Sequence, residues 1–318
     1  MVSTLVIGID GATWDVVNTL LEKDSLPNLA AVRDSGVWGN LRSTHPPMTP
    51  QAWTSMVTGV NPGKHGIYDF RTQDPSTYEV RPVDSRDSQF PALWDVFAQQ
   101  NRSLGVVNLP VSHPAPNNAT FFVSGFPASR NDDITAPDEV GDYLSSDYKI
   151  EPSSDPDTNP EDYVEEVNQL AASRTDLTLS LLEDYDPELC WTVYMGVDWV
   201  QHYLWNETID GERAIHRTYR HIDREIGRLL DALDSPNILI VSDHGFQELS
   251  GEIHLNSLLE SMEELSVNDD SSNTSSWAAI SNVAKRILKQ LPHRYQQGIT
   301  NTARRWLPES ILQPLETT

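Results

Sequence analysis

The chain of 318 residues contains one cysteine, Cys190, and only five lysines. A single cysteine excludes an intrachain disulfide and a metal site built from several thiolates, and its apolar surroundings predict a core position. Long hydrophobic runs are also missing. The opening MVSTLVIGID has a short apolar run and no basic segment before it, unlike a signal peptide or a membrane span. We therefore expect a soluble cytoplasmic protein without a transmembrane segment.

Positive charge is scarce as well. The 22 Lys and Arg residues face 47 Asp and Glu residues, which gives a formal net charge of -25. Such a surface repels polyanions at low salt, so we expect no nucleic-acid polymer as a partner. The acid excess favours adaptation to a high-salt cytoplasm, where a Debye length of about 3 Å at 1 M screens self-repulsion. An ordinary acidic protein from a low-salt organism is the alternative.

Alternating strand and helix patterns predict the fold. Three apolar runs, at residues 4–10, 190–198 and 237–243, each end in an aspartate, and residues 103–108 and 120–126 are two further strand patterns. Buried parallel strands have such uninterrupted apolar runs. Helical patterns lie between them, at residues 14–23, 90–100, 161–185 and 213–233. The sequence therefore predicts an α/β fold of three layers, with a mostly parallel central sheet flanked by helices.

The composition changes towards the C-terminus. We expect one α/β domain over residues 1–262, a polar linker over 263–276 and a basic helical tail over 277–318. The tail is interpreted either as an amphipathic helix covering sheet surface or as a basic element that docks on a partner or an anionic surface. Residues 127–160 are predicted to be loops with one short helix.

Acidic and imidazole side chains follow the predicted strands. Sites in open α/β sheets form beyond the carboxyl ends of the strands, so three strand-end aspartates are expected to converge there. Asp198 and His202 are four residues apart, which puts them on one face of a helix as metal ligands or as an ordinary surface ion pair. Asp243 and His244 are adjacent, and a turn ending at Gly245 lets both reach one cleft.

Thr49 begins a short helical pattern that follows several prolines. Free backbone N–H groups at a helix N-terminus favour an anion, although the threonine is equally explained as a helix cap. Its hydroxyl is a poor nucleophile near neutral pH and needs a base or a metal for activation. Asn108 ends another strand pattern and is either a hydrogen-bond donor to a phosphoryl oxygen or a turn asparagine.

Together these motifs resemble the alkaline phosphatase superfamily, and within it the type I phosphodiesterase/nucleotide pyrophosphatase family. The matching segments occur in the family order and span most of residues 1–260: GIDGA (8–12), MTPQAWTSMVTGVNPGKHGI (48–67), GVDWVQH (196–202) and SDHGF (242–246). The resemblance implies an alkaline phosphatase-like fold and hydrolysis of small-molecule phosphate esters. It also implies a phosphothreonine formed on Thr49 and then hydrolysed by water.

A site for two divalent metal ions is implied by the same resemblance, with zinc expected and manganese as the alternative. One ion would be held by Asp10, Thr49, Asp243 and His244, and the other by Asp198 and His202. Mixed carboxylate and imidazole ligands suit zinc, and two ions clamp both oxygens of an in-line displacement. His65 in NPGKHGI matches a family histidine that is not generally a ligand, so we expect it to support the loop.

The family pattern is incomplete in one respect. Its second metal normally has a third protein ligand, a histidine well beyond the SDHG motif, and this sequence has no clear equivalent. His254 is a candidate replacement and otherwise an ordinary loop histidine, whereas His293 lies in the basic tail. We interpret the chain as a C-terminally shortened, haloarchaeal type of member. The alternative is a degenerate relative that binds rather than catalyses, and sulfatase or phosphotransferase activities are lesser options.

Overall fold

The computed structural model describes residues 2–130, 132–234, 236–262 and 264. The chain divides into two compact units, Met1–Glu248 and Leu249–Thr318. The first holds all the motifs quoted above, and the second contains helix α9 (Leu255–Ser261). Apart from Glu264, the predicted linker 263–276 and the predicted basic tail 277–318 lie outside the described residues. The domain boundary at residue 262 stays a prediction.

A six-stranded sheet forms the centre of the first unit, in the order β10-β1-β7-β4-β5-β6. All neighbouring strands are parallel except the last pair, β5 and β6. This confirms the predicted mostly parallel sheet, and each predicted strand is present. The strands are β1 (Thr4–Ile9), β4 (Leu104–Leu109), β5 (Phe121–Ser124), β6 (Thr135–Ala136), β7 (Leu189–Tyr194) and β10 (Asn237–Val241).

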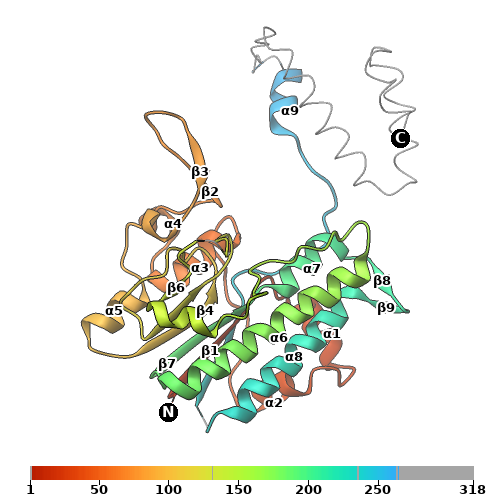
Figure 1. The fold of residues 1–318 in the computed structure, drawn as a ribbon. Coiled ribbons are helices and arrows are strands. Elements are labelled where there is room, and N and C mark those ends of the chain that lie inside the picture. Colours follow the sequence, from red (N-terminus) through yellow and green to blue (C-terminus); the bar gives the residue numbers. More distant parts are fainter. Residues whose placement is uncertain (1, 131, 235, 263, 265–318) are drawn as a thin grey trace. The chain divides into compact units, whose positions relative to one another are not determined.

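Helices cover the sheet (Figure 1). They are α1 (Trp14–Leu21), α2 (Pro27–Ser35), α3 (Thr49–Thr58), α4 (Pro62–His65), α5 (Leu93–Gln99), α6 (Pro160–Tyr185), α7 (Gly196–Leu204) and α8 (Ala214–Ala232). Two small hairpins, β2 (Arg71–Gln73) with β3 (Val80–Pro82) and β8 (Thr208–Ile209) with β9 (Glu212–Arg213), lie outside the sheet, and Asp138–Tyr143 is a 3-10 turn. Within the described residues, no helix combines the length and the apolar character needed to cross a membrane.

Strand β1 shows how the sequence builds the three layers. Alternate side chains of a strand point to opposite faces. Leu5 and Ile7 therefore join the core packed under α1, α6 and α8, whereas Val6 joins a second core with Trp53 of α3 and Phe97 of α5. Both faces of the sheet are covered, which explains why the strand sequences are continuously apolar. The parallel arrangement also brings the carboxyl ends of β10, β1 and β7 to one edge.

Candidate metal centre

Three side chains that follow neighbouring strands meet at this edge. Asp10 comes directly after β1, Asp198 lies in the first turn of α7 after β7, and His244 follows β10. One ligand atom from each lies within 4.8 Å of the others. Asp10 and Asp198 are buried, and His244 is half-buried. The predicted convergence of strand-end acids is thus present in the fold.

Asp243 lies beside this group and is almost completely buried. Its Oδ1 accepts a hydrogen bond from the Gly11 backbone N–H at 3.1 Å, and its Oδ2 lies 3.3 Å from His244 Nε2. Gly11 has a φ of +67°, and a Cβ there would lie 2.9 Å from Asp198 Oδ1. A glycine at this turn therefore lets backbone and carboxylates approach closely.

Thr49 is the first residue of α3 and is buried with its hydroxyl facing the acids. Its Oγ1 donates to Asp10 Oδ1 at 3.4 Å and lies 3.2 Å from His244 Nε2. The N-cap position belongs to Met48, so Thr49 is not the capping residue that we considered as the alternative.

Asp198 and His202 share one face of α7, as their spacing predicts, with 3.4 Å between Asp198 Oδ1 and His202 Nε2. The His202 side chain is 59% exposed, and its ring packs edge-on against Phe246 with 4.9 Å between ring centroids. Trp205 stacks on Phe246, with 5.5 Å between ring centroids. The pair is compatible both with metal binding and with a surface ion pair.

Burial and mutual repulsion dominate the electrostatics. Burial raises the pKa of Asp10 well above its usual value, Asp243 and Asp198 raise it further, and hydrogen bonds from Trp53 and Thr49 oppose the shift. Burial also raises the pKa of Asp243 to about 6, against the lowering effect of His244. The nearby Asp198 carboxylate raises the pKa of His202, and burial opposes this shift.

These carboxylates fit a divalent cation. Within the part of the chain that the structure describes, their ion-pair partners are histidines and never Lys or Arg. Asp198 Oδ1 and Asp243 Oδ2 are buried oxygens without a hydrogen-bond partner. Buried charges are normally paired or bound to a metal, so two orphaned oxygens beside two imidazoles form a donor set suited to zinc.

Asn108 is buried near the end of β4, in a left-handed backbone conformation with a φ of +61°. Its Nδ2 donates to the Val193 carbonyl at 2.7 Å, while its Oδ1 is buried and has no hydrogen-bond partner. The amide N–H group thus has a structural role, but Asn108 lies within β4 at a register irregularity and not in a turn. Its contact with a substrate stays a prediction.

The other histidines singled out in the sequence, His65 and His254, differ in their surroundings. His65 is buried, its Nε2 lies 3.0 Å from Ser55 Oγ and its Nδ1 accepts from the Ile67 N–H, so it braces α3 against the following turn. His254 lies in the second unit, where its exposed imidazole is 4.0 Å from Glu252. Its role as a replacement ligand stays a prediction, and His293 lies outside the described residues.

Other residues shape the centre through hydrogen bonds that the sequence does not predict. Gln201 of α7 donates to the Gly11 carbonyl at 2.8 Å and accepts from Tyr219 of α8. The same tyrosine oxygen accepts from the Thr13 N–H. Trp53 donates to Asp10. Gly11, Trp53 and Gln201 each lie in a motif quoted above, but the motifs do not predict these hydrogen bonds.

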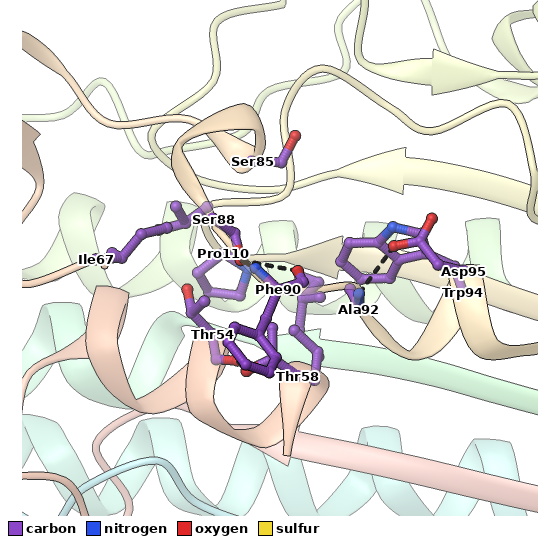
Figure 2. A pocket seen from close by; sticks show the side chains of 13 residues that line it. Thr54, Thr58, Ile67, Ser85, Ser88, Phe90, Ala92, Trp94, Asp95 and Pro110 are labelled. Carbon is purple, nitrogen blue, oxygen red and sulfur yellow. Dashed lines mark hydrogen bonds between the residues drawn. The ribbon is translucent and has the colours of Figure 1, made fainter. Parts of the chain in front are cut away.

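A separate pocket of about 80 Å³ lies between α3 and the chain around Pro110 (Figure 2). Thr54, Thr58, Ser85 and Ser88 supply hydroxyl groups to its wall, and Phe90 and Trp94 supply aromatic rings. None of the candidate metal ligands lines it. The pocket is therefore distinct from the acidic centre.

Comparisons with known proteins identify the family and the fold. The sequence model of the type I phosphodiesterase/nucleotide pyrophosphatase family matches residues 4–308. Two structures of phosphonoacetate hydrolase from Sinorhizobium meliloti, in complex with phosphonoacetate and with phosphonoformate, share the fold. Their TM-scores are 0.56 and 0.55, their sequences are 18% and 19% identical, and each match covers 83% of this chain.

The chain spans 62% of the length of those hydrolases. At this level of identity the likeness shows the fold alone, and it confirms the alkaline phosphatase-like architecture. A comparison with curated proteins found no match.

Proposed function

Because this chain belongs to the type I phosphodiesterase/nucleotide pyrophosphatase family, we propose that it is a metal-dependent hydrolase of phosphate esters with Thr49 as the nucleophile. The observation that carries this proposal is the position of the Thr49 hydroxyl, which lies within 3.4 Å of both Asp10 and His244 in a buried acidic centre. Small-molecule phosphodiesters, pyrophosphates or phosphomonoesters are the expected substrates.

Two divalent ions, zinc or manganese, would bind at this centre. Asp243 Oδ2 and Asp198 Oδ1, the two orphaned oxygens, would each face one ion. The first ion would be held by Asp10, Thr49, Asp243 and His244, and the second by Asp198 and His202. When bound, such ions activate a hydroxyl group and offset the charge of the transferring phosphoryl group.

The chain's own residues then perform two displacements. Thr49 Oγ1 loses its proton and attacks phosphorus, the bond from phosphorus to the leaving oxygen breaks, and that oxygen takes the electron pair and a proton. Water attacks the resulting phosphothreonine and regenerates the Thr49 hydroxyl, so the net reaction is hydrolysis. The N-terminus of α3 favours the negative phosphoryl group, and Asn108 is the candidate for a hydrogen bond to it.

Assay of the purified chain with a nitrophenyl phosphate ester, with added zinc or manganese, tests this proposal. Thr49→Ala is expected to abolish turnover. Thr54→Ala is the matched control, because Thr54 is a buried threonine on the same helix that lines the separate pocket instead. An unchanged rate in Thr49→Ala would eliminate this residue as the nucleophile.

A degenerate member that binds a partner but does not catalyse is the second candidate. Two features favour this binding role. Among the described residues of the first unit, only Asp198 and His202 are candidate ligands for the second ion, and the His202 side chain is exposed. Metal analysis after dialysis separates the two: two ions per chain favour the enzyme, and none favours the binding module. Salt adaptation, C-terminal shortening and cytoplasmic location remain predictions.

A further inference from the structure

The indole of Trp53 reaches the centre of the acidic cluster. Its Nε1 donates to Asp10 Oδ2 at 2.7 Å, and both residues are completely buried. A hydrogen bond from an N–H group to a carboxylate is stronger than one between neutral groups. This contact therefore does more than satisfy a buried indole.

The two oxygens of Asp10 consequently have different surroundings. Oδ2 faces the indole, whereas Oδ1 faces Thr49 Oγ1 at 3.4 Å and His244 Nε2 at 3.6 Å. Rotation of the carboxylate about its Cβ–Cγ bond would break the short contact with Trp53. The indole thus holds the carboxylate in one orientation, with Oδ1 towards the other candidate ligands.

The surrounding sequence is built to accommodate this ring. Trp53 lies four residues after Thr49 on α3, so both side chains are on the helix face that meets the strand ends. A Cβ at Gly8, two residues before Asp10, would lie 2.5 Å from Trp53 Cη2. Glycine at position 8 therefore leaves the space that the indole occupies. Trp191 packs edge-on against the ring, with 6.3 Å between centroids.

We propose that Trp53 is a positioning residue that makes Asp10 a one-oxygen ligand, with Oδ1 presented to a divalent cation and Oδ2 held by the indole. This inference rests on the proposed function, because it assumes that a cation binds at Asp10. Residues that orient a metal ligand typically contribute about 10-fold to 100-fold in metal affinity or activity.

Trp53→Phe removes the N–H group and keeps an aromatic ring in the core. Trp191→Phe is the matched control, because Trp191 is a buried neighbour in the same cluster whose Nε1 has no hydrogen-bond partner. Zinc affinity of the full chain is measured by competition with a chromophoric chelator. We expect Trp53→Phe to weaken binding by about 10-fold to 100-fold and Trp191→Phe to bind like the wild type.

A second readout uses the wild-type protein labelled with 15N at its nine indoles. The Trp53 N–H resonance is expected to be shifted downfield by its carboxylate partner and to move when zinc is added. This measurement does not require a folded Trp53 variant.

The outcomes separate this inference from the proposed function. Equal zinc affinities in wild type and Trp53→Phe, equal losses in both variants, or a Trp53 resonance that ignores zinc would overturn the positioning role and leave the hydrolase proposal intact. Wild-type protein that binds no divalent cation would overturn both.

Discussion

Thr49 Oγ1 lies 3.2 Å from His244 Nε2, although 195 residues separate them in the chain. The contact joins the start of α3 to the turn after β10, the edge strand of the sheet. A hydroxyl group held between an imidazole and a buried carboxylate needs an explanation beyond packing, and a nucleophile in a metal centre provides it.

Asp243→Asn is expected to have opposite effects with and without metal. Burial raises the pKa of Asp243 to about 6, so the protonated carboxyl group is favoured in the folded protein. The free energy of unfolding should therefore fall as the pH rises from about 4 through 6. At pH 8 without metal, the ionised carboxylate opposes folding, and Asn should stabilise the protein by on the order of 2 kcal/mol. With zinc bound, the same substitution should destabilise it.

Denaturant unfolding of both proteins, with zinc and with a chelator, measures this reversal. Asp223→Asn is the control, because Asp223 is a buried aspartate that caps α2. This substitution should destabilise the protein both with zinc and with the chelator. The same sign for Asp243→Asn in both conditions contradicts a metal-binding role.

Metal binding should release protons. Burial raises the pKa of Asp10 well above its usual value and raises that of Asp243 to about 6, so a cation must displace the proton that Asp243 carries at pH 5. Zinc affinity should therefore rise as the pH increases from 5 towards 6, by up to about tenfold per pH unit for each proton released, and should level off above pH 6. Calorimetry in buffers of different ionisation enthalpy counts the protons, and a release of none would rule out these carboxylates as ligands.

Glu166 of α6 should anchor the loop at residues 149–155. Partial burial opposes its ionisation, but hydrogen bonds from Lys149, Ser154 and the Ser153 backbone hold its pKa well below the usual range. Glu166→Gln should lower the free energy of unfolding by about 1 to 3 kcal/mol at pH 7. Because the shift is downward, this difference should shrink as pH falls below about 4.3, the ordinary value for glutamate.

The neighbouring Glu165→Gln is the control, since Glu165 is exposed and contacts only Gln169 one turn along the helix among the described hydrogen bonds. Urea unfolding at pH 7 and at pH 3 compares the two variants. A Glu166→Gln deficit that is as large at pH 3 as at pH 7 would show that side-chain packing, and not the charge, anchors the loop.

Asp223 should stabilise the start of α2. Its Oδ1 accepts from the Leu29 N–H at 2.7 Å, and its Oδ2 accepts from the Asn28 N–H and Nδ2. Asp223→Ala leaves these donors unsatisfied and should cost about 1 to 3 kcal/mol. Asp231→Ala, an exposed position on the same helix, should change the stability by less than about 0.5 kcal/mol. Thermal unfolding compares them, and similar melting temperatures would argue against this cap.

The pattern of strand ends explains how much of the site could be predicted. Asp10 and Asp243 follow the carboxyl ends of β1 and β10, so their convergence follows from strand topology, whereas β7 ends at Tyr194 and the first turn of α7 carries Asp198 to the same edge. The helix that begins at Thr49 follows from the prolines and the short helical pattern. These features can be predicted because each depends on a short segment of the sequence.

Contacts that depend on three-dimensional packing could not be predicted in this way. The bond between Trp53 and Asp10 joins residues 43 apart, and a tryptophan on an amphipathic helix predicts a core residue and nothing more. The space for it comes from Gly8, whose role is visible only when the ring is in place. Gln201 lies in the GVDWVQH motif, but the motif does not reveal its partner, which is the backbone carbonyl of Gly11.

Covalent modification of Thr49 is the central step of the proposed reaction. Acid quenching during turnover of a slowly hydrolysed phosphate ester, followed by mass spectrometry of the digested protein, detects this directly. A phosphoryl group on the peptide that contains Thr49, absent from Thr49→Ala and present in Thr54→Ala, is the predicted result. Turnover by the wild type with no phosphoryl group on that peptide at any quench time, and with equal activity in Thr49→Ala, would contradict it.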